Sequence, residues 1–247
     1  MADKVKRIGH LLGVAASFLT VFPVPQRGYQ GGDLAYASFA FPLVGLGIGA
    51  VVWGARFLAE WRTGNPLLSS FLALFVWVFL TRGLHLDGVA DVCDALFSGR
   101  DKEGRRLILK DPRVGTFGVL GVLFTLGMKG VSVFGLHGSF PFLFTPVLGR
   151  TVALLFGAFF PPSSPQGLGG EFVGKAGKGF FLFWLAVLLF WGLEVGGISA
   201  LLKTILTFGI MFTLGKKLSQ SFGGLSGDMV GAGIEWGEAL FLFLLRV

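Results

Sequence analysis

A succession of long apolar segments constrains the fold of this chain more than any other feature. A helix needs about 20 predominantly apolar residues to cross the hydrocarbon core of a bilayer. Six segments reach or approach that length, namely 34–58, 67–86, 114–136, 140–160, 180–197 and 198–215. Two shorter apolar stretches, 11–22 and 239–245, predict interfacial or half-membrane helices near the ends of the chain.

The composition supports the same fold class. Hydrophobic residues make up 53% of the 247 residues and charged residues only 14%, against about 25% charged in an ordinary soluble domain. The single cysteine, Cys93, excludes an intramolecular disulfide framework. The sequence therefore predicts an all-α, multi-pass integral membrane helical bundle with about six transmembrane helices, forming one domain over residues 1–247.

The distribution of basic residues predicts which loops face the cytoplasm. Segment 87–113 holds six of the 21 Lys and Arg residues, so the positive-inside rule makes it cytoplasmic. Six crossings then place segments 1–33, 161–179 and 216–238 on the same face. The net charge of +7 is explained by contact with the lipid bilayer and its anionic headgroups, with no nucleic-acid partner. The N-terminal segment, with no small-residue cleavage site after its apolar stretch, is expected to be retained as an interfacial or re-entrant segment.

Three carboxylates at helical spacing form the sharpest local pattern. Asp87, Asp91 and Asp94 stand at i, i+4 and i+7, which places them on one stripe of a helix. Like charges on one stripe repel each other unless a cation lies among them, and hard oxygen ligands suit Mg²⁺, Mn²⁺ or Ca²⁺. The alternative is an ordinary acidic face on a solvated helix.

A second acidic stretch follows near the C-terminus. Asp228 and Glu235 share an i, i+7 relation, and glycines at 223, 227 and 231 form a small-xxx-small pattern that allows close helix approach. We expect this helix to pack beside the first and to complete a metal site or supply a base. Glycine packing with incidental surface acids is the alternative.

Basic residues offer candidate phosphate contacts. In segment 110–118, Asp111 and Pro112 predict a helix start, where Arg113 and free backbone N–H groups suit a phosphate. A charged cytoplasmic anchor is the alternative there. Arg150 lies at the middle of an apolar segment, so it is expected to face a polar cavity, an acidic helix or an anionic ligand. Lys129, in the 114–136 segment, is expected to snorkel to the interface.

These motifs together resemble the cobalamin synthase family, the adenosylcobinamide-GDP ribazoletransferases. Residues 82–119 (RGLHLDGVADVCDALFSGRDKEGRRLILKDPRVGTFGV) are similar to that family's signature. Residues 18–25 (FLTVFPVP) and 41–45 (FPLVG) resemble its N-terminal region, and residues 223–235 resemble its C-terminal motif. The resemblance therefore runs through most of the chain.

The resemblance implies the last assembly step of the cobalamin nucleotide loop. The substrates would be adenosylcobinamide-GDP and α-ribazole or its 5′-phosphate, with Mg²⁺ as cofactor and GMP released, at the cytoplasmic face of a prokaryotic inner membrane. On this reading Asp87, Asp91, Asp94 and Asp228 hold the metal, and Asp228 or Glu235 accepts the hydroxyl proton. The implied phosphate contacts are Arg82, Lys110, Arg113 and Arg150.

Two rival functions and the oligomeric state stay open from sequence. The DGVAD run at 87–91 loosely echoes the start of the CDP-alcohol phosphotransferase pattern, although Asp91 stands where that pattern has Arg. A cation transporter would also need membrane carboxylates. Against it, the acids gather toward one surface and no inverted repeat is visible. A homo-oligomer is also compatible with the sequence.

Overall fold

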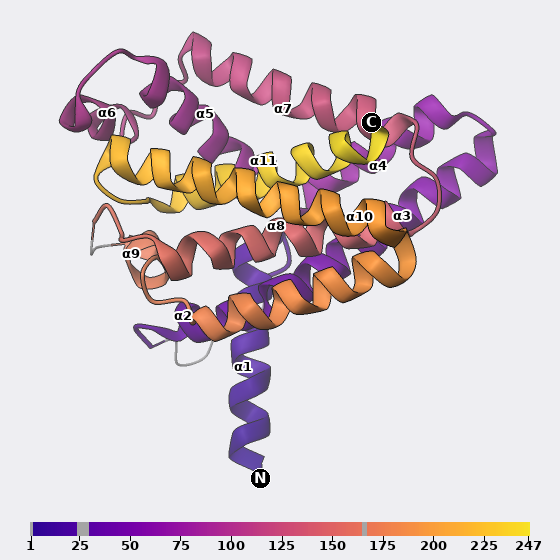
Figure 1. Cartoon of the computed structure of the whole chain (residues 1–247), viewed down its shortest axis with the longest axis horizontal. Coiled ribbons are helices and arrows are strands. Elements are labelled where there is room, and N and C mark those ends of the chain that lie inside the picture. Colours follow the sequence, from indigo (N-terminus) through magenta and orange to yellow (C-terminus); the bar gives the residue numbers. More distant parts are fainter. Residues whose placement is uncertain (1, 24–29, 165–166) are drawn as a thin grey trace.

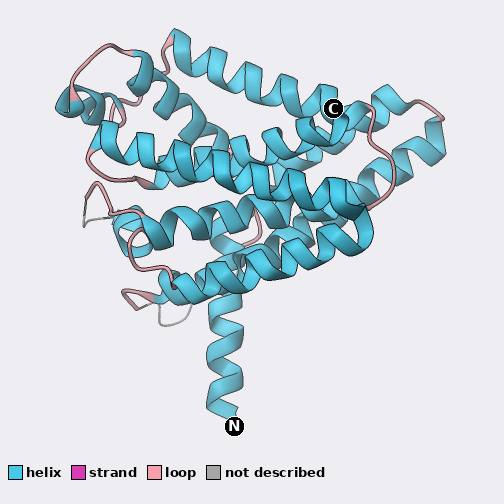
Figure 2. Ribbon diagram, in the orientation of Figure 1, coloured by secondary structure: helices cyan, strands magenta, loops and turns pink. Residues whose placement is uncertain are grey.

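The computed structural model describes residues 2–23, 30–164 and 167–247, and over these ranges the chain is helical (Figure 2). The one extended pairing within them is an isolated bridge between Pro162 and Leu225. The helices are α1 (Ala2–Leu19), α2 (Asp33–Ala37), η1 (Ser38–Ala40), α3 (Phe41–Thr63), α4 (Pro66–Leu80), α5 (Leu84–Phe97), α6 (Lys102–Ile108), α7 (Thr116–Phe134), α8 (Phe140–Phe159), α9 (Gly167–Phe172), α10 (Lys178–Phe222) and α11 (Gly227–Arg246).

The spanning helices confirm a multi-pass membrane fold. By length and composition, Asp33–Thr63, α7, α8 and α10 each qualify as a span. The 45 residues of α10 are interrupted at Gly197, whose φ of 70° is not helical. The chain folds back there, so α10 forms two antiparallel arms that match the expected spans 180–197 and 198–215 (Figure 1).

The expected span 67–86 is not one straight helix. Helix α4 ends at Leu80, α5 begins at Leu84, and the two are bent by 85°. Arg82 and Gly83 between them have positive φ values of 55° and 64°. Left-handed residues cannot continue a right-handed helix, so the chain turns at this point and α5 leaves the direction of α4.

Burial is distributed as a membrane protein requires. Large apolar side chains face outward, with Phe124 73% and Val131 76% exposed, whereas Arg150 is fully buried. Helix α8 is the central element, because it packs against α3, α10 and α11. An apolar exterior around buried charges is stable in lipid and costly in water, which places this bundle in a bilayer.

The N-terminal segment is a helix that projects from the bundle. Its last turns pack through Val14, Ala15 and Leu19, and Figure 1 shows its first half extending away from the other helices. Val5 and Ile8 are exposed on this projecting half. Helix α1 is therefore not a re-entrant loop, and it is not one of the candidate spans. Residues 24–29, which include the end of the FLTVFPVP motif, lie outside the described residues.

Two of the segments expected on one face, 87–113 and 161–179, reach the same end of the bundle, but most of segment 1–33 forms the projecting helix α1 and segment 216–238 does not stay at that end. Figure 1 shows α6 and α9 at the same end, with the α3–α4 connection and the α10 bend at the other. The expectation of a polar surface segment at 216–238 is wrong, because α10 continues to Phe222 and α11 then runs back into the bundle. Ser226 caps α11 by accepting a hydrogen bond from the N–H of Met229 at 3.3 Å.

The first acidic helix packs backbone to backbone against the start of α11. A Cβ placed on Gly88 of α5 would lie 2.5 Å from the carbonyl oxygen of Asp228. Of the small-xxx-small series, Gly231 takes part in the same approach, because a Cβ there would lie 3.3 Å from the Cα of His85 on α5, whereas Gly227 faces Gly169. Gly223, the first member of that series, lies outside α11 and ends α10 with a φ of 71°.

Replacing Gly88 should test this contact directly. We expect Gly88→Ala to destabilise the protein by about 1–3 kcal/mol, because the added methyl group overpacks the α5–α11 contact. Gly54→Ala on α3 is the matched control, since a Cβ there meets nothing within 4 Å. It should be neutral or stabilising. Thermal unfolding in detergent measures both, and equal midpoints would contradict the close contact.

Candidate active site

The two acidic stretches, far apart in sequence, meet where α5 packs against α11. Asp87, Asp91 and Asp94 all lie on α5 as expected. Asp91 is electrostatically coupled to Asp87 and Asp94 on its own helix and to Asp228 at the start of α11. The acidic group, defined here as Asp87, Asp91, Asp94 and Asp228, is therefore one cluster of negative charge built from two helices.

Asp94 has a structural partner within this group. Its Oδ2 accepts the N–H of Gly115 at 2.6 Å and its Oδ1 accepts the N–H of Gly118 at 2.8 Å, so it caps the first turn of α7. A Cβ on Gly115 would lie 2.5 Å from Oδ1 of Asp94, which explains the glycine there. The expected helix start at Asp111 and Pro112 is wrong. Helix α7 begins at Thr116. The Asp94 carboxylate of α5 accepts hydrogen bonds from N–H groups at this helix start, which were expected to be free to bind a phosphate.

The acidic group fits a divalent ion whose coordination shell is shared with a ligand. Within the described ranges, no three Asp, Glu, His or Cys side chains converge closely enough to hold a metal by themselves. Mg²⁺ is commonly bound by one or two carboxylates together with substrate phosphates rather than by an all-protein cage. Carboxylates that repel each other beside a cavity fit a metal site shared with a substrate better than they fit a closed, all-protein metal site.

Two cavities adjoin the acidic group. The α7 chamber, of about 610 Å³, is bordered by Asp87, Leu86 and the α7 residues Val119 and Val122. The α11 chamber, of about 560 Å³, is bordered by Asp228, Ser226, Ser163 and Gly231. Phe18, Arg82 and Leu84 border both chambers, so the two cavities meet at these three residues. Volumes of this size suit small-molecule ligands.

Arg82 is held in an unusual conformation between the two chambers. Its φ of 55° is the only positive value among the described non-glycine residues, and such strained positions cluster at functional sites. Its Nη2 donates to the carbonyl oxygen of Val21 at 3.1 Å, which orients the guanidinium. The structure thus brings one expected phosphate ligand, Arg82, to the acidic group.

Two other basic candidates lie apart from the chambers. Arg113 is 86% exposed and pairs with Asp111, from Nη2 to Oδ2 at 2.6 Å. The Arg113 guanidinium lowers the pKa of Asp111 to about 2. Lys110 is exposed on the same loop. Neither residue is among the described residues that border the two chambers.

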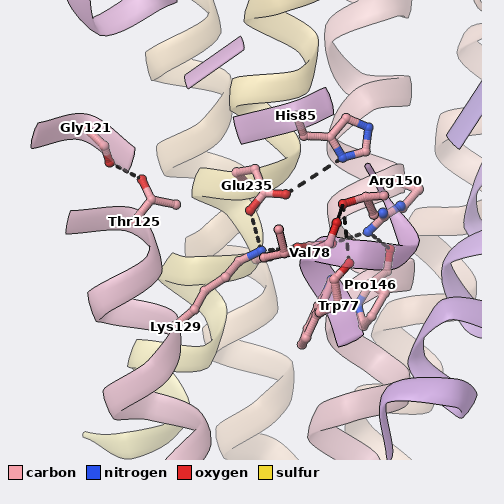
Figure 3. A network of polar contacts seen from close by, with 11 residues as sticks. Trp77, Val78, His85, Gly121, Thr125, Lys129, Pro146, Arg150 and Glu235 are labelled. Atoms are coloured by element: carbon pink, nitrogen blue, oxygen red, sulfur yellow. Dashed lines mark hydrogen bonds and ion pairs between the residues drawn. The ribbon is translucent and has the colours of Figure 1, made fainter. Parts of the chain in front are cut away.

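The remaining candidates, Arg150 and Glu235, belong to a buried charge network. Arg150 of α8 pairs with Glu238 of α11, and Lys129 of α7 lies 2.5 Å from Glu238 and 2.6 Å from Glu235. Figure 3 shows Glu235 between the Lys129 ammonium and the His85 ring, whose Nδ1 is 3.8 Å away. The buried network, defined as Lys129, Arg150, Glu235 and Glu238, joins three helices with two charges of each sign.

The network corrects two expectations. Lys129 does not snorkel to the interface, because it is 2% exposed and its ammonium is paired inside the bundle and lies 4.9 Å from the Trp77 ring. Glu235 and Glu238 are not at the membrane surface. Glu235 is not among the described residues that border either chamber. Arg150 was expected to face a polar cavity, an acidic helix or an anionic ligand, and the structure pairs it with the acidic helix α11. The sequence did contain a signal for this pairing, because charged residues within apolar segments usually pair with one another, and the chain has two such cations and two such acids.

Removing one acid from the network should be costly. We expect Glu238→Gln to destabilise the protein by about 3–5 kcal/mol, because it leaves the buried Arg150 without its counter-ion. Asp111→Asn is the control, since Asp111 pairs with an Arg113 side chain that is 86% exposed and surface pairs contribute little. Chemical unfolding in micelles measures both variants, and a Glu238→Gln protein as stable as Asp111→Asn would refute the role of the network.

Comparison with known proteins identifies relatives along nearly the whole chain. Residues 11–246 match the family model described as cobalamin-5-phosphate synthase. A protein of Klebsiella pneumoniae subsp. pneumoniae named adenosylcobinamide-GDP ribazoletransferase is 35% identical over 240 residues, covering 94% of this chain and 97% of its own. Proteins of the same name from Escherichia coli O157:H7 and strain K12 are 34% and 32% identical, and each alignment covers 93% of this chain and 96% of the relative.

No solved structure matches this chain significantly. The family model nonetheless covers both acidic stretches, Arg82 and the buried network in a single alignment. The chain belongs to the cobalamin-5-phosphate synthase family.

Proposed function

We propose that the protein is an adenosylcobinamide-GDP ribazoletransferase. It joins adenosylcobinamide-GDP to α-ribazole or α-ribazole 5′-phosphate, forms adenosylcobalamin or its 5′-phosphate, and releases GMP. The relatives that carry this name align over more than nine-tenths of the chain. The active site faces the cytoplasm of a prokaryotic inner membrane, because the positive-inside rule makes the basic segment 87–113 cytoplasmic, and Asp87, Asp91 and Asp94 of the acidic group belong to that segment.

One observation carries the proposal. Acidic residues of two stretches meet beside cavities that share a conformationally strained arginine. Phosphoryl transfer depends mostly on positioning and on stabilising charge at the transferred group. Carboxylates for a metal and a guanidinium for phosphate oxygens are the groups that such a reaction needs.

The reaction is a substitution at phosphorus. The ribazole 3′-hydroxyl oxygen attacks the phosphorus that bears the aminopropanol arm of cobinamide. The bond from that phosphorus to the bridging oxygen of GMP breaks, and GMP leaves with the electron pair. The hydroxyl proton passes to a carboxylate of the acidic group, for which Asp87 and Asp228 are suited because each borders a chamber.

Asp91 would hold Mg²⁺ together with whichever of Asp87 and Asp228 does not take the proton, while Asp94 fixes the start of α7 against them. The ion would supply charge neutralisation at the diphosphate oxygens. Arg82 steadies the same oxygens from between the chambers. Arg113 and Lys110, on the exposed loop before α7, would contact the phosphates of an arriving substrate outside the chambers.

A reconstituted assay tests the activity. Purified protein in liposomes should release GMP and form a cobalamin product from adenosylcobinamide-GDP, α-ribazole 5′-phosphate and Mg²⁺, and EDTA should stop the reaction. Chromatography of nucleotide and corrinoid products measures both. Activity that survives complete chelation would exclude the metal assignment, and failure to form either product would exclude the transferase.

Asp91→Asn separates function from stability. Turnover at limiting Mg²⁺ should be slower, because the activation free energy should rise by several kcal/mol. This is the scale of charge stabilisation by a metal. Thermal stability should be unchanged or higher, because the substitution removes repulsion among Asp87, Asp91 and Asp228. Asp111→Asn, in the exposed pair with Arg113, is the control for a surface acid. A variant with near-normal turnover, or one that fails only through unfolding, would contradict the assignment of Asp91.

A further inference from the structure

A single imidazole connects the buried network to the α11 chamber and has no part in the mechanism above. His85 lies in the first turn of α5, its side chain is 4% exposed, and it borders that chamber. Its Nδ1 faces the Glu235 carboxylate, 3.8 Å from Oε1 (Figure 3). Because Glu235 belongs to the network, His85 links the network to the chamber.

The ring and the carboxylate are both held in place by neighbouring elements. A Cβ on Gly231 of α11 would lie 3.3 Å from the Cα of His85 and 3.6 Å from Cδ2 of its ring, so α11 packs closely against this residue. Oε2 of Glu235 accepts a hydrogen bond from the Lys129 ammonium at 2.6 Å, which orients Oε1 toward the imidazole. The separation of 3.8 Å exceeds hydrogen-bond length, and polar contacts in unliganded sites commonly shorten when a ligand binds.

The Glu235 carboxylate selects one form of the imidazole. A neutral imidazole has one N–H donor and one nitrogen with an acceptor lone pair. The ring interacts electrostatically with Lys129 and Arg150, and these two cations disfavour a positive charge on it. A lone pair on Nδ1 would face the lone pairs of Oε1, whereas an N–H there is attracted to them. The proton of the ring therefore lies on Nδ1, and the acceptor lone pair lies on Nε2.

The lone pair on Nε2 is available to a ligand in the α11 chamber. Nδ1 is a buried atom without a hydrogen-bond partner in the described part of the chain, whereas Nε2, on the ring edge away from Glu235, is not fully buried (Figure 3). The accessible space that His85 borders is the α11 chamber. An acceptor nitrogen binds O–H and N–H groups and not ionised phosphate oxygens, which carry no hydrogen. His85 therefore complements Arg82, whose guanidinium can only donate.

We infer that His85 binds a ribose hydroxyl group of a substrate by accepting a hydrogen bond at Nε2, and that Glu235 is the positioning residue that holds the ring in its Nδ1–H form. The identity of this ligand rests on the proposed function, because both adenosylcobinamide-GDP and α-ribazole carry ribose hydroxyls. Arg82 then contacts phosphate oxygens while His85 contacts a sugar. His85 fixes the position of the hydroxyl and takes no proton from it, since the neighbouring cations oppose the charge.

Nuclear magnetic resonance tests the form of the ring without any substrate. In protein carrying isotope-labelled histidine, the nitrogen chemical shifts distinguish a protonated from an unprotonated ring nitrogen. The His85→Gln variant identifies the His85 signals by their loss. At neutral pH we expect a neutral ring with its proton on Nδ1. A proton on Nε2, or on both nitrogens, would overturn the inference.

Glu235→Gln tests the positioning role in the same spectrum. The Lys129 ammonium can only donate, so it takes the amide oxygen and leaves the amide N–H groups facing Nδ1 of His85. The proton of the ring should then move to Nε2. Glu238→Gln is the matched control, because it also removes one acid of the network but leaves Oε1 of Glu235 beside the ring. The same ring form in both variants would exclude Glu235 as the positioning residue. If these variants do not fold, the wild-type spectrum and the substitutions of His85 decide.

Substitutions of His85 test ligand binding. His85→Phe keeps a planar ring without nitrogen, so the KM of the substrate that carries the bound hydroxyl should rise about tenfold. His85→Gln retains an acceptor oxygen and should keep that KM within about threefold of the wild-type value. His137→Gln is the matched control, because His137 is exposed and is not among the described residues that border either chamber. It should leave both KM values unchanged.

The substrate whose KM rises identifies the source of the hydroxyl as adenosylcobinamide-GDP, α-ribazole 5′-phosphate or both. Unchanged KM values in a His85→Phe protein that melts like the wild type, or an equal rise in His85→Gln, would refute the binding role. If His85→Phe does not fold, His85→Leu gives the same comparison. A wild-type protein that forms no cobalamin product would instead refute the proposed function and leave the ring form measured by resonance unaffected, so the two failures are distinguishable.

Discussion

The buried pairing of Lys129 and Arg150 with Glu235 and Glu238 is the interaction on which the arrangement of this bundle depends. Helix α11 carries two carboxylates in its middle, and an unpaired carboxylate facing lipid is strongly disfavoured. The helix is stable only inside the bundle, where α7 and α8 each supply a cation. Once α11 is fixed there, its first turn lies against Gly88, and Asp228 joins the carboxylates of α5.

The site and the network therefore have opposite electrostatic designs, although they share helix α11. The network balances two cations with two acids and excludes solvent, which gives rigidity. The acidic group places four carboxylates together, and one of them, Asp94, is satisfied by the start of α7. Clustered like charge lowers stability, and enzymes tolerate that cost where binding or catalysis needs it. A rigid support a few turns away keeps the repelling helices from separating.

The break between α4 and α5 gives the site its second component. Had residues 67–86 formed one straight helix, Arg82 would have lain on a regular helix face. The left-handed residues Arg82 and Gly83 instead turn the chain by 85°, and Arg82 comes to lie between two cavities. The sequence identified Arg82 and the three α5 carboxylates but not the chambers, because each cavity is bordered by residues of several distant segments that only the tertiary structure brings together.

Local pattern and composition determined the membrane fold, the helical stripe of Asp87, Asp91 and Asp94, and the family resemblance, since each depends on hydrophobicity or spacing along one segment. The same reasoning placed Glu235 at the surface, Lys129 at the interface and a helix start at Asp111, and all three were wrong. Each depended on a partner far away in sequence: a cation on α7, acids on α11, and the capping carboxylate Asp94 on α5. Only tertiary packing decides which charges meet, because the free energy of a buried charge is set by its neighbours in space and not by its neighbours in the chain.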